Sequence, residues 1–156
     1  MLSLHHFLSV TPIGATALLL SLTACSNNDG ERVQETEKEV LAIHDEVMPR
    51  LDSVMVLRKQ ITQRIDSLDK AGGSTQAASA TLRTDDEKSQ LMLLSQRLRE
   101  ADSLMMDWMS RYNGDTLKQL DQAQAVQYLE QEKEKITNVK DKINSSIADA
   151  RRYLDE

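Results

Sequence analysis

The sequence predicts an all-α protein: an antiparallel up-down-up three-helix bundle or coiled coil that follows a cleaved signal peptide. Three observations predict this fold class. The 156 residues include only five Gly and two Pro, too few for a turn-rich β protein. All 25 acidic and all 19 basic residues lie after Cys25, which sets the first 25 residues apart. Beyond them, apolar residues recur at steps of three, four and seven, the spacing of one helix face.

Residues 1–24 are predicted to be a lipoprotein signal peptide. The apolar run over residues 13–22 has the length of a secretory h-region, and it is shorter than the ~20 apolar residues that span a membrane. It ends in Leu22-Thr23-Ala24-Cys25, which resembles the bacterial lipobox. The resemblance implies cleavage before Cys25 and covalent lipid on that cysteine. The N-terminal lipid would then hold the protein at a membrane.

The segment 25–31 joins the lipidated cysteine to the helical region. It is small and polar, and we expect a flexible tether. Ser26 follows the cysteine where an Asp would alter sorting, and this pattern resembles outer-membrane lipoproteins of enterobacteria. We therefore expect a lipid anchor in the bacterial cell envelope, in the outer membrane rather than the inner, facing the periplasm rather than the cell surface.

The bundle domain is expected to cover residues 32–156, with helices at about 32–70, 85–112 and 121–155. Pro49 lacks an N–H, so it should kink or split the first helix near Met48. Thr84-Asp85-Asp86-Glu87 looks like a capping box that opens the second helix. The third helix follows a short connector. The three apolar stripes are Val33, Val40, Ile43, Val47, Leu51, Val54, Ile61, Ile65 and Leu68; Leu91, Leu94, Leu98, Ala101, Met105, Trp108 and Tyr112; and Leu129, Ile136, Val139, Ile143, Ile147, Ala150 and Leu154.

Composition and motifs argue against an enzyme. The chain has no Gly-rich phosphate loop, nucleophile elbow or His-rich zinc motif. After Cys25 it has a single histidine, His44, and no further cysteine, while its many carboxylates fall on polar helix faces. The net charge of -6 has the wrong sign for a nucleic-acid partner. No cofactor is expected beyond the covalent lipid.

One cluster of soft side chains carries an alternative interpretation. Thioether and imidazole groups suit Cu(I) or Ag(I), and a Trp face can cover a cation. Antiparallel packing would bring the middle of the first helix near the end of the second. Packing of methionines around a lone Trp explains the same pattern without a metal. The candidate metal ligands are His44, Met48, Met55, Met105, Met106 and Met109, with Trp108 as the cation–π partner.

Three stretches together resemble a group of small lipoproteins from Bacteroidetes, some labelled "viral A-type inclusion protein". The stretches are His-Asp-Glu-Val-Met-Pro-Arg at 44–50, Ala-Asp-Ser-Leu-Met-Met-Asp-Trp-Met at 101–109, and Tyr128-Leu129-Glu130 leading to Ile136. The resemblance covers residues ~37 to ~150. It implies a helical envelope lipoprotein and transfers no site residues.

The sequence therefore predicts a lipid-anchored, non-catalytic structural or protein-interaction module. Its partner would be an envelope protein or a second copy of the chain, bound through an exposed helix face. The alternative is a periplasmic Cu(I)/Ag(I)-binding buffer or chaperone.

Overall fold

The computed structural model describes residues 26–72 and 78–155 and confirms an all-α bundle. Its elements are α1 (Ser26–Val47), α2 (Arg50–Gly72), α3 (Ala78–Arg111), the short 3₁₀ helix η1 (Gly114–Gln119) and α4 (Gln122–Asp155). No strand occurs in these two ranges. The predicted signal peptide and Cys25 lie outside the described residues. Within the described ranges, no helix combines the length and apolar character needed to cross a membrane.

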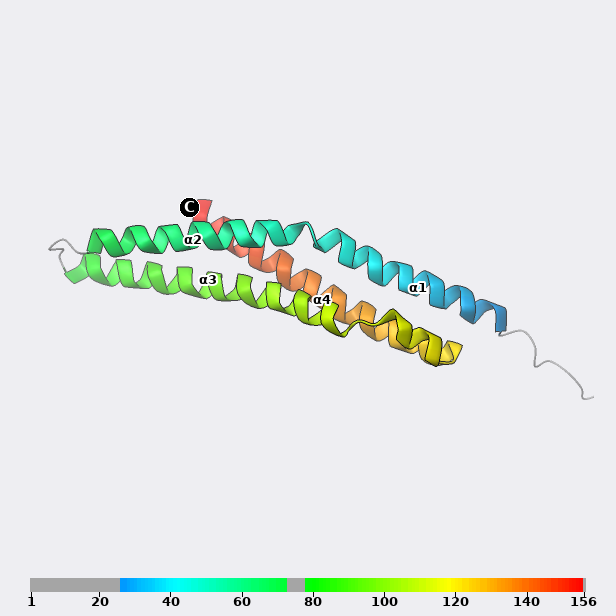
Figure 1. The fold of residues 1–156 in the computed structure, drawn as a ribbon. Helices are drawn as coiled ribbons and strands as arrows, with labels where there is room; N and C mark the ends of the chain where they lie inside the picture. Colours follow the sequence, from blue (N-terminus) through cyan, green and yellow to red (C-terminus); the bar gives the residue numbers. More distant parts are fainter. Residues whose placement is uncertain (1–25, 73–77, 156) are drawn as a thin grey trace, which may run out of the picture.

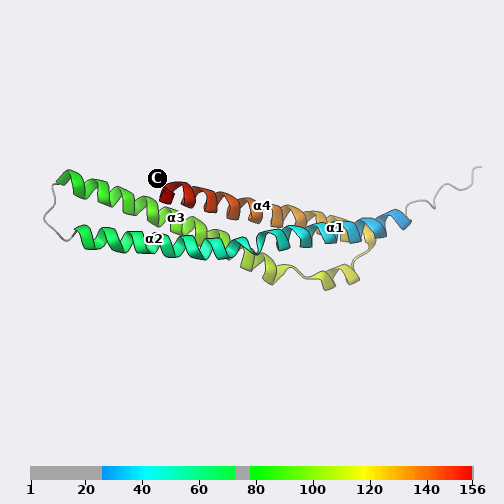
Figure 2. The ribbon, with the colours of Figure 1, turned by 90° about the horizontal axis from the view of Figure 1, so that it is seen from above.

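The helices form an elongated rod rather than a compact bundle. α1 and α2 follow one another along one side, α3 returns beside α2, and α4 returns again beside α3 and α1 (Figures 1 and 2). The end of α4 lies partway along α2, where Tyr153 and Leu154 adjoin Arg64, Glu87 and Leu91. Beyond that level, α2 and α3 continue as a two-helix hairpin. We call its far end the hairpin tip; the start of α1 lies at the opposite end of the rod.

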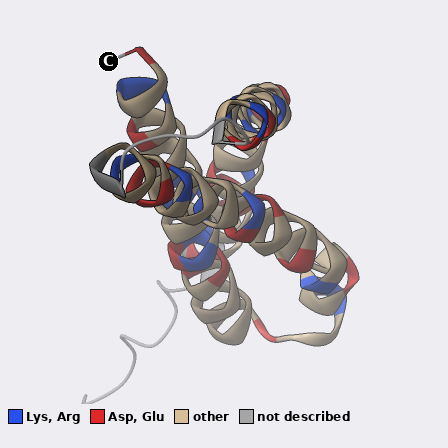
Figure 3. Ribbon diagram, turned by 90° about the vertical axis from the view of Figure 1, so that its left-hand side faces the viewer, with Lys and Arg blue, Asp and Glu red and all other residues tan. Residues whose placement is uncertain are grey.

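Ion pairs on the surface match this topology. Lys133 pairs with Glu39 and Lys140 pairs with Glu46, each at 2.7 Å, and the partners are 94 positions apart in the sequence in both pairs. The constant separation means that α1 and α4 run parallel and in register, as the first and third helices of an up-down-up bundle must. Figure 3 shows both signs of charge distributed along the helices.

The predicted helix break is present at Pro49. α1 ends at Val47 and α2 begins at Arg50. The Met48 N–H still donates to the carbonyl of His44 at 2.9 Å, and the Leu51 N–H donates to that of Met48 at 3.2 Å. The chain therefore passes from one helix to the next in a single turn.

The predicted tether is wrong for residues 26–31, because α1 begins at Ser26. Small polar residues do not prevent a helix when its next turns are packed. Asp29 pairs with Arg32 one turn later, at 3.7 Å. A Cβ at Gly30 would lie 3.2 Å from the Gln122 amide nitrogen, so α1 already contacts α4 at this point.

The predicted capping box at Thr84 is also wrong. α3 begins at Ala78, and the Thr84 hydroxyl donates to the carbonyl of Ala80 at 3.0 Å, as a threonine inside a helix does. Residues 78–84 contain no Gly or Pro, so nothing stops the helix from extending upstream. A reciprocal cap occurs instead at α4, where Asp121 accepts from the Gln124 N–H at 2.8 Å and Gln124 accepts from the Asp121 N–H at 3.3 Å.

The core is one thin aliphatic layer along the rod. Most of the predicted stripe residues line it, and Leu57 joins them. The largest side chains with no more than trace exposure are Ile61, Leu91, Leu98, Met105, Leu129, Ile136, Ile143, Val40, Val47 and Val54.

Candidate functional site

A buried polar contact joins α3 to α4 near the helix break. Trp108 is 6% exposed, and its indole Nε1 donates to the Glu132 carboxylate at 3.0 Å. Glu132 is equally buried, and it also accepts from the Lys135 ammonium at 2.7 Å. A buried carboxylate is costly unless it is paired and hydrogen-bonded, and here both conditions are met.

Two further rings lie beside Trp108. The Tyr112 ring stacks on it, with centroids 5.0 Å apart and an interplanar angle of 20°. The His44 ring of α1 lies 5.6 Å away, tilted by 32°. His44 Nδ1 is held 3.0 Å from the Asp45 carboxylate. We call His44, Trp108, Tyr112 and Glu132 the aromatic–carboxylate cluster; it joins α1, α3 and α4.

The Tyr112 hydroxyl is the uncompensated polar group of this cluster. Its oxygen is buried and has no hydrogen-bond partner among the described residues. Burial, aided by the negative charge of Glu37 and by Tyr128 and Glu132, raises the pKa of Tyr112 to about 12. The phenol therefore stays neutral at any ordinary pH.

The structure separates the predicted metal ligands into three environments. Met105 is fully buried in the core, while Met48 and Met109 are partly buried against it. Met55 and Met106 are 57% and 48% exposed, outside the core. His44 is thus brought to Trp108, and two of the six candidate ligands face solvent. No group of three or more His, Cys, Asp or Glu side chains that could hold a metal occurs in the described ranges.

The predicted cation–π partner has other neighbours. The rings next to Trp108 are those of Tyr112 and His44, and its N–H is bound to Glu132. The arrangement is that of an interhelical packing cluster with one internal hydrogen bond. Cu(I) or Ag(I) binding by the methionines stays a prediction, tested below.

Sequence reasoning missed Glu132, although a signal was present. Leu129, Glu132, Ile136 and Val139 follow one another at steps of three, four and three, so Glu132 occupies a core position of the α4 stripe. A charged residue in a core slot needs a buried partner. Trp108 was the available partner, because this single tryptophan carries an N–H donor and lies on the neighbouring stripe.

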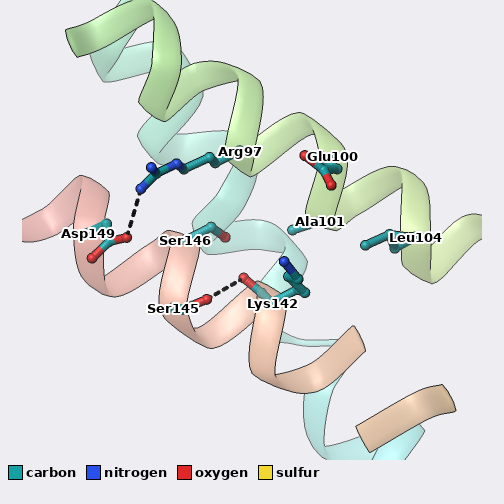
Figure 4. A pocket seen from close by; sticks show the side chains of 8 residues that line it. All are labelled: Arg97, Glu100, Ala101, Leu104, Lys142, Ser145, Ser146 and Asp149. Carbon is teal, nitrogen blue, oxygen red and sulfur yellow. Dashed lines mark hydrogen bonds and ion pairs between the residues drawn. The ribbon is translucent and has the colours of Figure 1, made fainter. Parts of the chain in front are cut away.

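An open groove runs along the outside of α3 and α4. It consists of two adjoining hollows of about 300 and 370 Å³, which share Leu104 and Lys142. Figure 4 shows the first hollow, with Arg97 joined to Asp149 across it. We call the whole feature the α3–α4 groove. Its lining residues are Arg97, Glu100, Ala101, Leu104, Asp107, Trp108 and Arg111 on α3, and Glu132, Lys135, Asn138, Val139, Lys142, Ser145, Ser146 and Asp149 on α4.

The aromatic–carboxylate cluster is packed between helices, and the α3–α4 groove is shallow and open. Comparison with protein-family models, with curated proteins and with solved structures found no match for this chain.

Proposed function

We propose that this protein is a lipid-anchored helical-bundle lipoprotein of the bacterial envelope, a non-catalytic structural or protein-interaction module. Its lipid would be carried on Cys25, in the outer membrane and facing the periplasm. The observation that carries the proposal is that the two ends of the rod are formed by different parts of the chain. The start of α1 and the hairpin tip lie at opposite ends of the molecule (Figures 1 and 2).

This arrangement makes the rod suitable as a spacer between a membrane anchor at one end and a binding partner farther along it. α1 follows directly on Cys25, so an anchor there would lie at the α1 end of the rod. Residues 26–72 run from that end to the hairpin tip and would extend over about 70 Å at the helical rise per residue. The module would therefore present its outer surfaces at fixed distances from the membrane.

The chemistry of the described surface supports a binding role over a catalytic one. The core is aliphatic and closed, with Trp108 and Glu132 already satisfying each other inside it. Apart from the buried Glu132, the charged side chains of the described residues lie outside the core, and some of them form ion pairs within or between neighbouring helices. Binding partners would meet long helix faces, the mode in which helical modules recognise other helices.

Membrane fractionation tests the anchor. We expect the full chain, expressed in a Gram-negative host, to be recovered with outer membranes and to incorporate radiolabelled fatty acid. Cys25→Ser should lose both the label and the membrane association. The matched control Ser26→Ala leaves the cysteine and should retain both. Recovery of Cys25→Ser in the membrane, or absence of label from the parent chain, would refute lipid anchoring.

A further inference from the structure

The two edges of the α3–α4 groove carry opposite charges at each level. Followed along α3 from Arg97 to Arg111, the charges are positive, negative, negative and positive. Followed in the same direction through the rod, from Asp149 to Glu132, the charges of α4 are negative, positive, positive and negative. The Arg97–Asp149 ion pair at 3.3 Å sets the levels at one end, and the Trp108–Glu132 hydrogen bond sets them at the other. The two series are Arg97, Glu100, Asp107 and Arg111 on α3, and Asp149, Lys142, Lys135 and Glu132 on α4, of which Glu132 is buried and already bound to Trp108 and Lys135.

Two of these charges are left without a partner. Arg97 pairs across the groove, while Arg111 pairs with Asp107 at 2.8 Å on its own helix. Glu100 and Lys142, by contrast, have no side-chain hydrogen bond or ion pair with any residue that the structure describes. In Figure 4 they project from opposite edges of the same hollow. The groove therefore offers one free anion and one free cation at its centre.

The centre of the groove also permits close approach of another helix. Ala101, Ser145 and Ser146 are small, and Leu104, which lies one helical turn after Ala101 on α3, is only partly buried. The lined part of α3, residues 97–111, is about 21 Å long. That is enough for roughly four turns of a helix packed along it.

We propose that the α3–α4 groove is the contact surface of a side-by-side dimer of this chain. In a dimer with its two-fold axis along the rod, α3 of each copy faces α4 of the other, so Arg97, Glu100 and Asp107 of one copy meet opposite charges on α4 of its partner. Glu100 of one copy then pairs with Lys142 of its partner, twice by symmetry. The four groove helices together form a four-helix layer, with Leu104 covered.

The parallel orientation agrees with the anchor. With the axis along the rod, both α1 starts lie at the same end, so two lipidated copies can occupy one membrane. The dimer rests on the proposed function in one respect: it takes the binding partner of the module to be a second copy of the same chain. The fractionation of Cys25→Ser and the dimer test below therefore fail independently.

Charge exchange between co-expressed copies tests the dimer. Two full-length copies with different C-terminal tags are extracted in non-ionic detergent, and one tag is used for capture. We expect parent copies to co-purify. When both copies carry Glu100→Lys, or both carry Lys142→Glu, two attractions become two repulsions, and recovery of the second tag should fall about tenfold. One Glu100→Lys copy with one Lys142→Glu copy restores both pairs and should restore recovery.

The matched control is Lys59→Glu on α2, an exposed charge of the same kind outside the groove, which should leave recovery unchanged. Circular dichroism of each variant checks that the helices are intact. Parent copies that do not co-purify would overturn the dimer. Equal recovery from all charge combinations would overturn the groove as its contact surface, as would failure of the mixed pair to recover.

Discussion

The indole Nε1 of Trp108 and the carboxylate of Glu132 form a 3.0 Å hydrogen bond inside the contact between α3 and α4. These are the two longest helices of the described residues, each of 34 residues, and apart from Glu132 and Ser146 the buried residues of α4 are apolar. Apolar stripes alone can slide by a turn at little cost. A buried donor and acceptor that are satisfied only in one register penalise such a shift, because sliding leaves both unpaired.

Removing the Glu132 carboxylate should therefore lower the free energy of unfolding. We expect Glu132→Ala to lower the free energy of unfolding by about 2–4 kcal/mol, because the Trp108 N–H is left buried and unpaired. Glu132→Gln keeps an acceptor and should cost less. Urea unfolding of both variants, combined with Trp108→Phe in a double-mutant cycle, should give a coupling energy of about 1–3 kcal/mol. Additive costs would show that the bond contributes nothing to the register.

Two adjacent methionines provide a test of core packing with an internal control. Met105 is fully buried, whereas Met106 is 48% exposed. Met105→Ala should destabilise the protein by about 2–5 kcal/mol through loss of burial and the cavity left behind. Met106→Ala should stay within about 0.5 kcal/mol of the parent. Thermal and urea unfolding measure both, and equal costs for the two would contradict the packing described here.

Periodicity in the sequence predicted the bundle because helix faces follow directly from residue spacing. The break at Pro49 was predictable for the same kind of local reason, since proline has no N–H to donate. The start of α3 was not, because Thr84 and Glu87 have the residue types of a cap while nothing upstream stops the helix. A cap motif shows that a helix is able to begin there, and packing decides whether it does.

Residue spacing predicted which helix face carries each residue of the candidate site, and it predicted nothing beyond that. Spacing placed His44 and Trp108 on facing stripes, and their rings are 5.6 Å apart. It grouped Met106 with its buried neighbour Met105, although successive residues differ by about 100° around a helix. Distances across helices, and hence the Trp108–Glu132 bond, require the interhelical register, which no single stripe contains.

Alkaline pH should weaken the fold through Tyr112. Its pKa rises from 10.0 to about 12 on folding, so the unfolded chain loses this proton first. The stabilisation of the neutral phenol is complete below pH 10 and is lost as pH rises toward 12. Tyr112→Phe should flatten this part of the stability profile. At neutral pH it should be at least as stable as the parent, because it removes a buried hydroxyl without a partner.

Urea midpoints across that pH range, with phenolate absorbance of the folded protein, measure the effect. Tyr128→Phe is the control, since its hydroxyl accepts from the Asn113 N–H at 3.4 Å and lies in an exposed contact. The control should keep the steep alkaline loss. A parent profile as flat as that of Tyr112→Phe would contradict the burial of this phenol.

Titration with Cu(I) decides between packing and metal binding at the methionines. We expect Trp108 emission to stay unchanged at one equivalent, because Tyr112 and His44 already lie against its ring. Met55 and Met106 also face solvent, and Met105 is enclosed in the core. The His44→Ala, Met109→Leu double variant serves as the control. Stoichiometric quenching in the parent that disappears in this variant would contradict the packing interpretation and establish a soft-metal site at His44 and Met109.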